Sequence, residues 1–336
     1  MSIKVAVVGV GNIGSIHAQI YADNKKSDLV AVCDIDREKA DRKAGQYGCR
    51  AFYSVKEMLA SGIKLDGASV ATKGEENGGD HYQPTMELLR AAIPVLGEKP
   101  ISNQLSEARE MVALAKEKKV PYAIDLNHRF TPAAAVARKW LDEGRLGTPH
   151  MVNMRMWINN PAETSPWFHL RALHPHSFDV LRYFCGDVES VACFCNKGEG
   201  RTIWSNAQIL LKFTNGMIGN LAGSYDATGP SGSFGLEHVD VSGSEGRFLL
   251  EEACQALTYY PRRSMEIETY RYIGGMLHFQ ETFKSRIDTW IDQLSDGVAD
   301  DKVLGSGREG LLAQEIIEAA ILSWEERRIV SISEVQ

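Results

Sequence analysis

Short apolar runs alternate with stretches of helical pattern from Ile3 to about Ala123. The apolar runs are IKVAVVG, LVAVCD, GASVAT, IPVLG and VPYAI, and the stretches between them include IGSIHAQIYA, REKADRKAGQY and LSEAREMVALAKEKK. Strands that alternate with helices of this length are joined by right-handed crossovers, so the sheet is parallel and both of its faces are covered. The sequence therefore predicts a doubly wound, Rossmann-type α/β domain over residues 1–124.

The pattern changes after Asp125, where strands follow one another with little helix between them. In AQILLKFTNGMIGNLAGSY, Asn215 and Gly216 lie between two alternating segments, a strong hairpin signal because both central turn positions need positive φ. A helical pattern returns in EGLLAQEIIEAAILSWEERR. We therefore expect residues 125–336 to form an α+β domain with a large, mostly antiparallel open sheet that is covered on one face.

The composition excludes several classes of partner. A net charge of −7 provides no basic stripe for nucleic acid, so a neutral small ligand or a partner protein fits better. No apolar stretch approaches the roughly 20 residues of a membrane helix, so we expect no membrane partner. The six cysteines form neither a CxxC pair nor a regular disulfide ladder, which predicts reduced thiols and a cytoplasmic protein.

A glycine motif lies between the first predicted strand and the first predicted helix. In VVGVGNIG, Gly9 makes a tight turn, Gly11 lets the backbone approach a pyrophosphate, and Gly14 allows close packing of helix on strand. Asn12 and Ile13 complete the turn, and we count them among the cofactor contacts. This context predicts a dinucleotide site more strongly than the glycine spacing alone.

The second predicted strand ends at Asp34, where a dinucleotide fold places an acid for the adenosine ribose. A carboxylate there accepts from the 2′-hydroxyl and repels a 2′-phosphate, so NAD is favoured over NADP. Arg37 lies nearby as a cation that accommodates a phosphate in some sites.

These motifs together resemble the Gfo/Idh/MocA family of sugar and cyclitol oxidoreductases. The features that match, in family order, are GVGNIG, Asp34, VAT at 70–72, His81, GEKPIS, NHRF at 127–130 and HSFD at 176–179. The resemblance implies a nicotinamide enzyme whose second domain binds substrate and forms a homodimer or homotetramer through its open sheet. It also implies that Thr72, His81 and Glu98 lie beside the cofactor and that Pro100 follows a cis peptide bond.

In such proteins the lysine of the EKP motif lies beside the nicotinamide and the substrate hydroxyl, and Lys99 is the matching residue. Oxidation of a secondary alcohol removes the hydroxyl proton as hydride leaves. An ammonium stabilises the developing alkoxide, and a group with a pKa near the working pH accepts the proton. We expect Lys99 in the first role and His176 in the second.

His176 and Asp179 are three residues apart at the start of a predicted helix, so we expect them to share a face. The chain departs from the family pattern here, because Ala172 stands where an aspartate is common and His174 replaces a glycine. His174 or His169 is an alternative second polar group at the substrate. The substrate contacts that we expect are Arg129, Asp179, His174 and Trp157.

Two further features of the sequence do not identify an additional site. The glycine-rich insertion in ATKGEENGGDHYQP fits a small lid near the nicotinamide and a plain surface loop equally well. The histidines at 169, 174 and 176 have no acid or cysteine at the usual ligand spacing, so we expect no metal.

Three functions are compatible with these residues. The first is an NAD-dependent dehydrogenase that acts on a secondary hydroxyl of a sugar, glycoside or cyclitol. The second is a redox-neutral glycosidase or lyase that oxidises its substrate transiently with tightly bound NAD, a reading that the alanine at position 172 keeps open. The third is a sensor of NAD and sugar without catalysis, which the presence of Lys99 and His176 disfavours.

Overall fold

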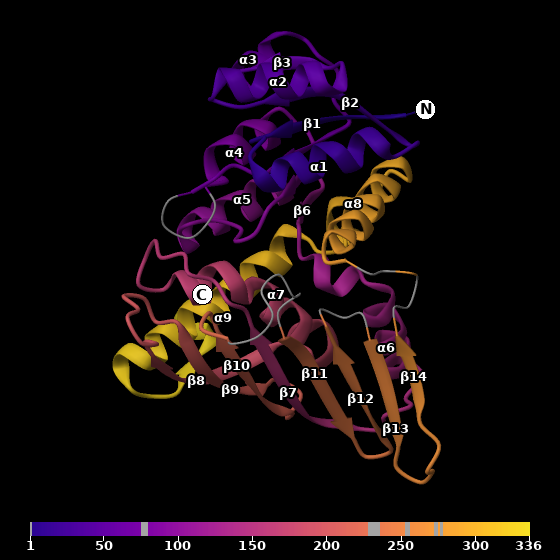
Figure 1. Ribbon diagram of the computed structural model, residues 1–336, viewed down its shortest axis with the longest axis vertical. Coiled ribbons are helices and arrows are strands. Elements are labelled where there is room, and N and C mark those ends of the chain that lie inside the picture. Colours follow the sequence, from indigo (N-terminus) through magenta and orange to yellow (C-terminus); the bar gives the residue numbers. More distant parts are fainter. Residues whose placement is uncertain (1, 75–79, 228–235, 253–255, 272–274, 276–277) are drawn as a thin grey trace. The chain divides into compact units, whose positions relative to one another are not determined.

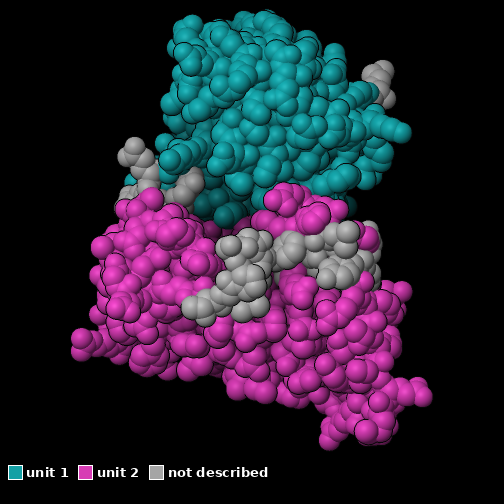
Figure 2. Space-filling view, viewed as in Figure 1, with its two compact units in different colours: residues 1–125, 283–311 teal, residues 126–282, 312–336 magenta. Residues whose placement is uncertain are grey.

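The computed structural model describes the chain except residues 1, 75–79, 228–235, 253–255, 272–274 and 276–277. The chain divides into two compact units, coloured separately in Figure 2. The first contains residues 1–125 and 283–311, and the second contains residues 126–282 and 312–336. Among the described residues, no helix is both long enough and apolar enough to cross a membrane.

The first unit is built on a six-stranded parallel sheet with the strand order β3-β2-β1-β4-β5-β6. Its strands are β1 (Ile3–Val8), β2 (Ser27–Cys33), β3 (Arg50–Phe52), β4 (Gly67–Val70), β5 (Val95–Gly97) and β6 (Tyr122–Ile124). The helices between them are α1 (Asn12–Asp23), α2 (Arg37–Tyr47), α3 (Val55–Ala60), α4 (Tyr82–Arg90) and α5 (Leu105–Lys118). This order confirms the doubly wound fold, in which the carboxyl ends of all the strands lie at one edge. Figure 1 shows helices α1 to α5 together with this sheet.

A helix from late in the chain completes the core of the first unit. In α8 (Gln280–Ser295), the buried residues Ile287, Trp290 and Ile291 pack with the core of the parallel sheet. We did not expect a helix in this segment, although its apolar residues recur at helical spacing. The first unit is therefore assembled from two separate segments of the chain.

The second unit contains a nine-stranded sheet with the order β14-β13-β12-β11-β7-β10-β9-β8-β15. Its strands are β7 (Pro149–Trp157), β8 (Val188–Asn196), β9 (Asn206–Phe213), β10 (Ile218–Ser224), β11 (Leu236–Gly243), β12 (Gly246–Glu251), β13 (Ala256–Pro261), β14 (Glu268–Arg271) and β15 (Val330–Ser331). Strands β7 and β10 pair in parallel, and the other described pairs are antiparallel. The expected hairpin joins β9 to β10. Gly216 has φ of +88°, but Asn215, for which we also expected positive φ, does not adopt it.

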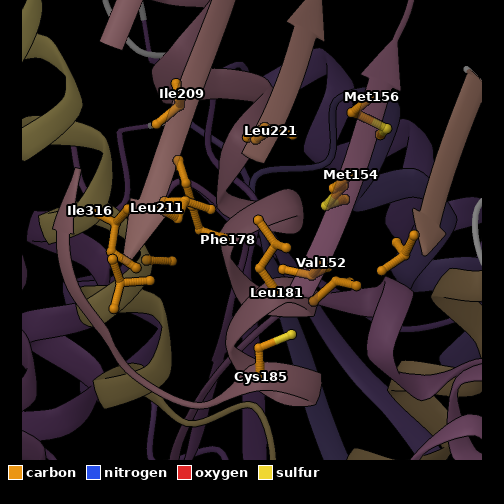
Figure 3. Close-up of a cluster of buried hydrophobic side chains, with 14 of the residues drawn as sticks. Val152, Met154, Met156, Phe178, Leu181, Cys185, Ile209, Leu211, Leu221 and Ile316 are labelled. Carbon is orange, nitrogen blue, oxygen red and sulfur yellow. The ribbon is translucent and has the colours of Figure 1, made fainter. Parts of the chain in front are cut away.

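Helices cover one face of this sheet. They are the 3-10 helix η1 (Asn127–Phe130), α6 (Pro132–Asp142), α7 (Phe168–Cys185) and most of α9 (Gly307–Glu326), and a short 3-10 helix η4 (Ile332–Glu334) ends the chain. Figure 3 shows the core between β7 and α7, where Val152, Met154 and Met156 lie with Phe178 and Leu181. Because side chains alternate along a strand, Trp157 lies on the opposite face of the sheet.

Helix α7 begins earlier than the sequence indicated. We expected His176 at the start of a helix with the sequence HSFDVLRYFCG. The structure contradicts this expectation: α7 starts at Phe168, and Pro175 lies inside it. Leu170 and Leu173 are buried in the core of the second unit, so packing outweighs the cost of an internal proline.

We predict that replacing Trp290 by alanine destabilises the protein by about 3 to 5 kcal/mol, the usual cost of deleting a buried aromatic side chain. Trp290 is fully buried in the first unit. Urea unfolding measures the change, and Lys284→Ala, at an exposed position of the same helix, is the matched control with an expected change below about 0.5 kcal/mol. A loss below about 1 kcal/mol for Trp290→Ala contradicts the packing described for α8.

Candidate functional site

The glycine turn between β1 and α1 has the backbone shape that a dinucleotide needs. Gly9 has φ of +82°, and a Cβ on it would lie 2.7 Å from the carbonyl oxygen of Ala71. A Cβ on Gly14 would lie 1.8 Å from the carbonyl oxygen of Gly9. Around Gly11, by contrast, the position of a Cβ is open, and as the N-cap of α1 this glycine has no side chain to cap the first amides. This turn therefore fits a pyrophosphate at the N-terminus of α1.

Asp34 lies directly after β2, and backbone amides hold both of its carboxylate oxygens. Oδ2 accepts from the amide of Val10 at 2.8 Å, and Oδ1 accepts from the amide of Asp36 at 2.9 Å. The acid is thereby fixed beside the glycine turn. Arg37, in contrast, holds its guanidinium carbon 4.1 Å from the ring centroid of Tyr53. Asp34 is therefore the charged group that the turn itself contacts.

Asn12, Ile13 and Thr72 belong to the same region. Asn12 and Ile13 begin α1, and the side chain of Ile13 is exposed. Thr72 lies two residues after β4, and its hydroxyl donates to the carbonyl oxygen of Asp80. This bond joins the two ends of the glycine-rich insertion. Residues 75–79, which we interpreted as a lid or a plain loop, lie outside the described residues.

His81 is buried at the start of α4 and anchors the segment that follows β5. Burial lowers the pKa of His81 to about 4, so its ring is neutral near pH 7. Nδ1 donates to the carbonyl oxygen of Pro100 at 2.8 Å. The Lys99–Pro100 peptide bond is cis.

A buried cluster of charges lies beside Lys99. His17 of α1 places Nδ1 3.0 Å from the hydroxyl of Ser69, and its Nε2 lies 3.1 Å from Glu98 and 3.2 Å from Asp125. Glu98 directly follows β5, and Asp125 directly follows β6. These groups therefore tie helix α1 to the carboxyl ends of two neighbouring strands.

The cluster shifts the pKa of each group through burial and neighbouring charge. Burial by itself would lower the pKa of His17, but hydrogen bonds to Asp125 and Glu98 raise it to about 9. Burial and the nearby Asp125 raise the pKa of Glu98. The pKa of Lys99 is lowered by burial, while Glu98 and Asp125 oppose that shift. A lysine with a lowered pKa at the end of a parallel strand has the electrostatics of a functional residue.

His17, Glu98 and Asp125 are also close enough together to hold a cation, because their ligand atoms lie within 4.8 Å of one another. A histidine must be neutral to bind a metal, and this one favours its protonated form near pH 7. We therefore interpret the three residues as a hydrogen-bonded network in which the N–H at Nε2 of His17 lies between the carboxylates of Glu98 and Asp125.

In the second unit, the predicted substrate contacts Arg129 and Asp179 bind each other. Nε of Arg129 donates to Oδ2 of Asp179 at 2.7 Å, and a second bond joins the guanidinium to Oδ1. Both side chains are buried. Asp179 is three residues after His176 on α7, so this bidentate pair fixes η1 against the helix that carries His176.

His176 lies against a residue that sequence reasoning missed. The ring of His128 stacks on that of His176, with centroids 4.3 Å apart and planes inclined by 8°. Nδ1 of His128 is 2.6 Å from Oε2 of Glu237, and both of these side chains are about 1% exposed. One pattern in the sequence could have indicated this acid: Glu237 alternates with Val239 and Val241, so it lies on the same buried face of β11 as these valines.

His174, expected near the substrate, lies in the core between α7 and the sheet. Its Nδ1 is 2.9 Å from the hydroxyl of Ser177, and its Nε2 is 3.1 Å from Nε2 of His169. Burial lowers the pKa of both histidines, that of His169 to about 3, so both rings are neutral near pH 7. A Cβ on Gly223 of β10 would lie 2.1 Å from Nε2 of His174. The pair is thus packed directly against the sheet.

Trp157, also expected to contact the substrate, lies away from His176, Arg129 and Asp179. Its ring is 4.8 Å from the guanidinium carbon of Arg155, on the face of the sheet opposite to α7. It lines a hollow of about 440 Å³ whose other members include Phe194, Gln208 and Asp226. The structure therefore does not bring Trp157 together with His176.

Two models from one family match the chain. The model described as an oxidoreductase family with an NAD-binding Rossmann fold matches residues 3–126, and the GFO/IDH/MocA C-terminal domain matches residues 134–249. The first match covers the part of the first unit that contains the glycine turn, and the second covers the part of the second unit that contains His176.

Relatives and solved structures agree with this match. The chain is 24% identical to an inositol 2-dehydrogenase of Rhizobium meliloti (strain 1021), an alignment that covers 99% of this chain and 100% of that protein. It is 26% identical to a D-apiose dehydrogenase of Paraburkholderia graminis, with coverage of 99% and 90%. An oxidoreductase from Agrobacterium radiobacter, solved with NAD⁺, L-tartaric acid and magnesium, has a similar fold, with a TM-score of 0.88, 20% identity and full coverage of both chains. The expected family and cofactor are confirmed: the chain belongs to the Gfo/Idh/MocA oxidoreductase family and is a dehydrogenase with an NAD-binding Rossmann domain.

Proposed function

We propose that the protein transfers a hydride between NAD and a secondary hydroxyl of a sugar, glycoside or cyclitol. The observation that carries the proposal is Lys99, a lysine of lowered pKa at the carboxyl end of a parallel strand and beside a buried charge cluster. Relatives named as inositol and D-apiose dehydrogenases support the substrate class. Both substrates in those names are polyhydroxylated and uncharged.

Lys99 and His176 have different tasks in this proposal. Lys99 binds the reacting oxygen and stabilises the negative charge that develops on it. His176 accepts the hydroxyl proton during oxidation and returns it during reduction. NAD, when bound, supplies the hydride acceptor. The turn at Gly9 and Gly11 and the carboxylate of Asp34 hold the dinucleotide, and the Arg129–Asp179 pair holds the part of α7 that carries His176.

The redox-neutral glycosidase and the sensor are not favoured by the comparisons. The relatives that align over nearly the whole chain are named as dehydrogenases. A sensor also has no need for a proton acceptor. We therefore retain net oxidation or reduction as the proposed reaction.

We predict that the purified protein forms NADH when it is given NAD and a panel of sugars, glycosides and inositols. Replacing Lys99 by alanine should lower kcat/KM at least about 100-fold, because the charge that stabilises the alkoxide is lost. The measurement is absorbance at the NADH wavelength. Lys116→Ala, on α5 in the same unit, is the matched lysine control and should stay within about twofold of the wild type.

Two results contradict this proposal. One is NADH formation that Lys99→Ala leaves unchanged, which removes the lysine from the chemistry. The other is a silent panel together with NAD-dependent release of an aglycone from glycosides, which indicates the redox-neutral reaction instead.

We also propose that the uncovered face of the nine-stranded sheet joins copies of the chain into a dimer or tetramer. Phe194, Leu210 and Ile218 are more than half exposed on outward positions of β8, β9 and β10, and Met151 on β7 is 40% exposed. Large apolar side chains gathered on one sheet face are typical of a protein interface. The cytoplasm remains the proposed compartment, supported by five cysteines that are free thiols in the described part of the chain.

For this interface, we predict that the double variant Phe194→Asp, Leu210→Asp is monomeric, because two buried carboxylates have no partners across the contact. Size-exclusion chromatography with light scattering gives the mass. Met265→Asp, at an exposed apolar residue of a loop, is the control and should leave the assembly intact. A wild-type protein that is already monomeric, or a double variant with unchanged mass, argues against the interface.

A further inference from the structure

The ring of His176 is constrained by a second histidine from a different element. His128 belongs to η1, and its ring lies nearly parallel to that of His176, with an angle of 8° between the planes. His128 also contacts the ring of Phe279 edge to face, with centroids 5.6 Å apart. Stacked and edge-to-face contacts of this kind each fix the plane of a ring. The orientation of His176 therefore depends on where His128 is held.

A buried carboxylate holds His128. Oε2 of Glu237 lies 2.6 Å from Nδ1 of His128, and both side chains are almost completely excluded from solvent. At this distance an imidazole nitrogen and a carboxylate oxygen repel each other unless a proton lies between them. Because imidazole is the stronger base of the two, we assign that hydrogen to Nδ1. Glu237 is on the inward face of β11, opposite Met156 of the neighbouring strand. The sheet thereby fixes the carboxylate, and the carboxylate fixes the ring.

The helix of His176 has an alanine at position 172, where an aspartate is common in the family. Ala172, one turn earlier on α7, has no polar side chain. Asp179, on the same helix, is engaged in the bidentate pair with Arg129. Glu237 is thus a buried acid of another element that reaches His176 through one intervening ring.

We propose that Glu237 and His128 are positioning residues for His176: the carboxylate anchors Nδ1–H of His128, and the anchored ring holds the imidazole of His176 in its reactive orientation. The role of His176 as proton acceptor rests on the function proposed above, but the positioning does not. The acid thus acts on His176 through a second ring.

The test compares two substitutions of the same carboxylate. Glu237→Leu keeps much of the volume but removes the acceptor, and Glu237→Gln keeps an acceptor oxygen for Nδ1–H. With the best substrate of the polyol panel, we expect Glu237→Leu to lower kcat about 10-fold with KM changed less than about threefold, the usual effect of losing an orienting partner. Glu237→Gln should recover most of that loss. Asp240→Leu, on the outward face of the same strand, is the control and should behave as the wild type.

A spectroscopic measurement makes the result independent of activity. In the NAD-bound protein with ¹⁵N-labelled histidine rings, the signal of His176 is the one that His176→Asn removes. We expect Glu237→Leu to move this signal and Asp240→Leu to leave it in place, because the stacked ring shifts only when it loses its anchor. If no polyol is oxidised, the proposed function fails, and this spectrum still decides the positioning.

An unchanged His176 signal in Glu237→Leu overturns the inference, as does equal kcat in the leucine and glutamine variants when both are slow. If Glu237→Leu fails to fold, His128→Phe replaces it, since the phenyl ring keeps the stack but has no N–H to anchor. The wild-type spectrum is decisive by itself on one point: a His128 ring without hydrogen on Nδ1 contradicts the proposal.

Discussion

The arrangement of the first unit depends on one buried imidazolium. His17 is fully buried, yet its pKa is raised to about 9, because its contacts with Asp125 and Glu98 outweigh the cost of desolvation. A buried charge of this kind persists only when it is paired and hydrogen-bonded. Its partners directly follow β5 and β6, so the interaction that binds the two carboxylates to His17 also aligns these strand ends and the backbone that leads into Lys99.

The proposed function depends on where the fold positions Lys99 and the cofactor-binding residues. Parallel strands deliver their carboxyl ends to a single edge of the sheet, and the glycine turn, Asp34 and Lys99 all lie at such ends. The second unit contributes a helix whose polar residues are held individually: Asp179 by Arg129, and His176 by the ring of His128. Each unit thus holds the groups that we propose as reactive by buried contacts of its own, as preorganised catalysis requires.

The sequence predicted the features that local backbone rules determine. The glycine turn, five of the six parallel strands and the hairpin at Asn215 follow from local sequence patterns, whereas β3 was not among the predicted strands. Contacts between distant segments were not predictable in this way. The return of α8 to the parallel sheet depends on a core that no local pattern identifies, and the early start of α7 reflects tertiary packing that outweighs Pro175. His17 and Glu237 each become significant only when a segment far away in the sequence supplies their partner.

The most direct test of the central interaction is the titration of the His17 ring by NMR in the NAD-bound protein, with the signal assigned by its loss in His17→Gln. A midpoint near 9 is the result that the account predicts. With the pKa raised on folding, the contribution of His17 to stability is fully present below pH 6.5 and is lost as the pH rises through about 9. A midpoint at or below 6.5 would mean that desolvation exceeds the hydrogen bonds to Glu98 and Asp125, and it would contradict the charge cluster beside Lys99.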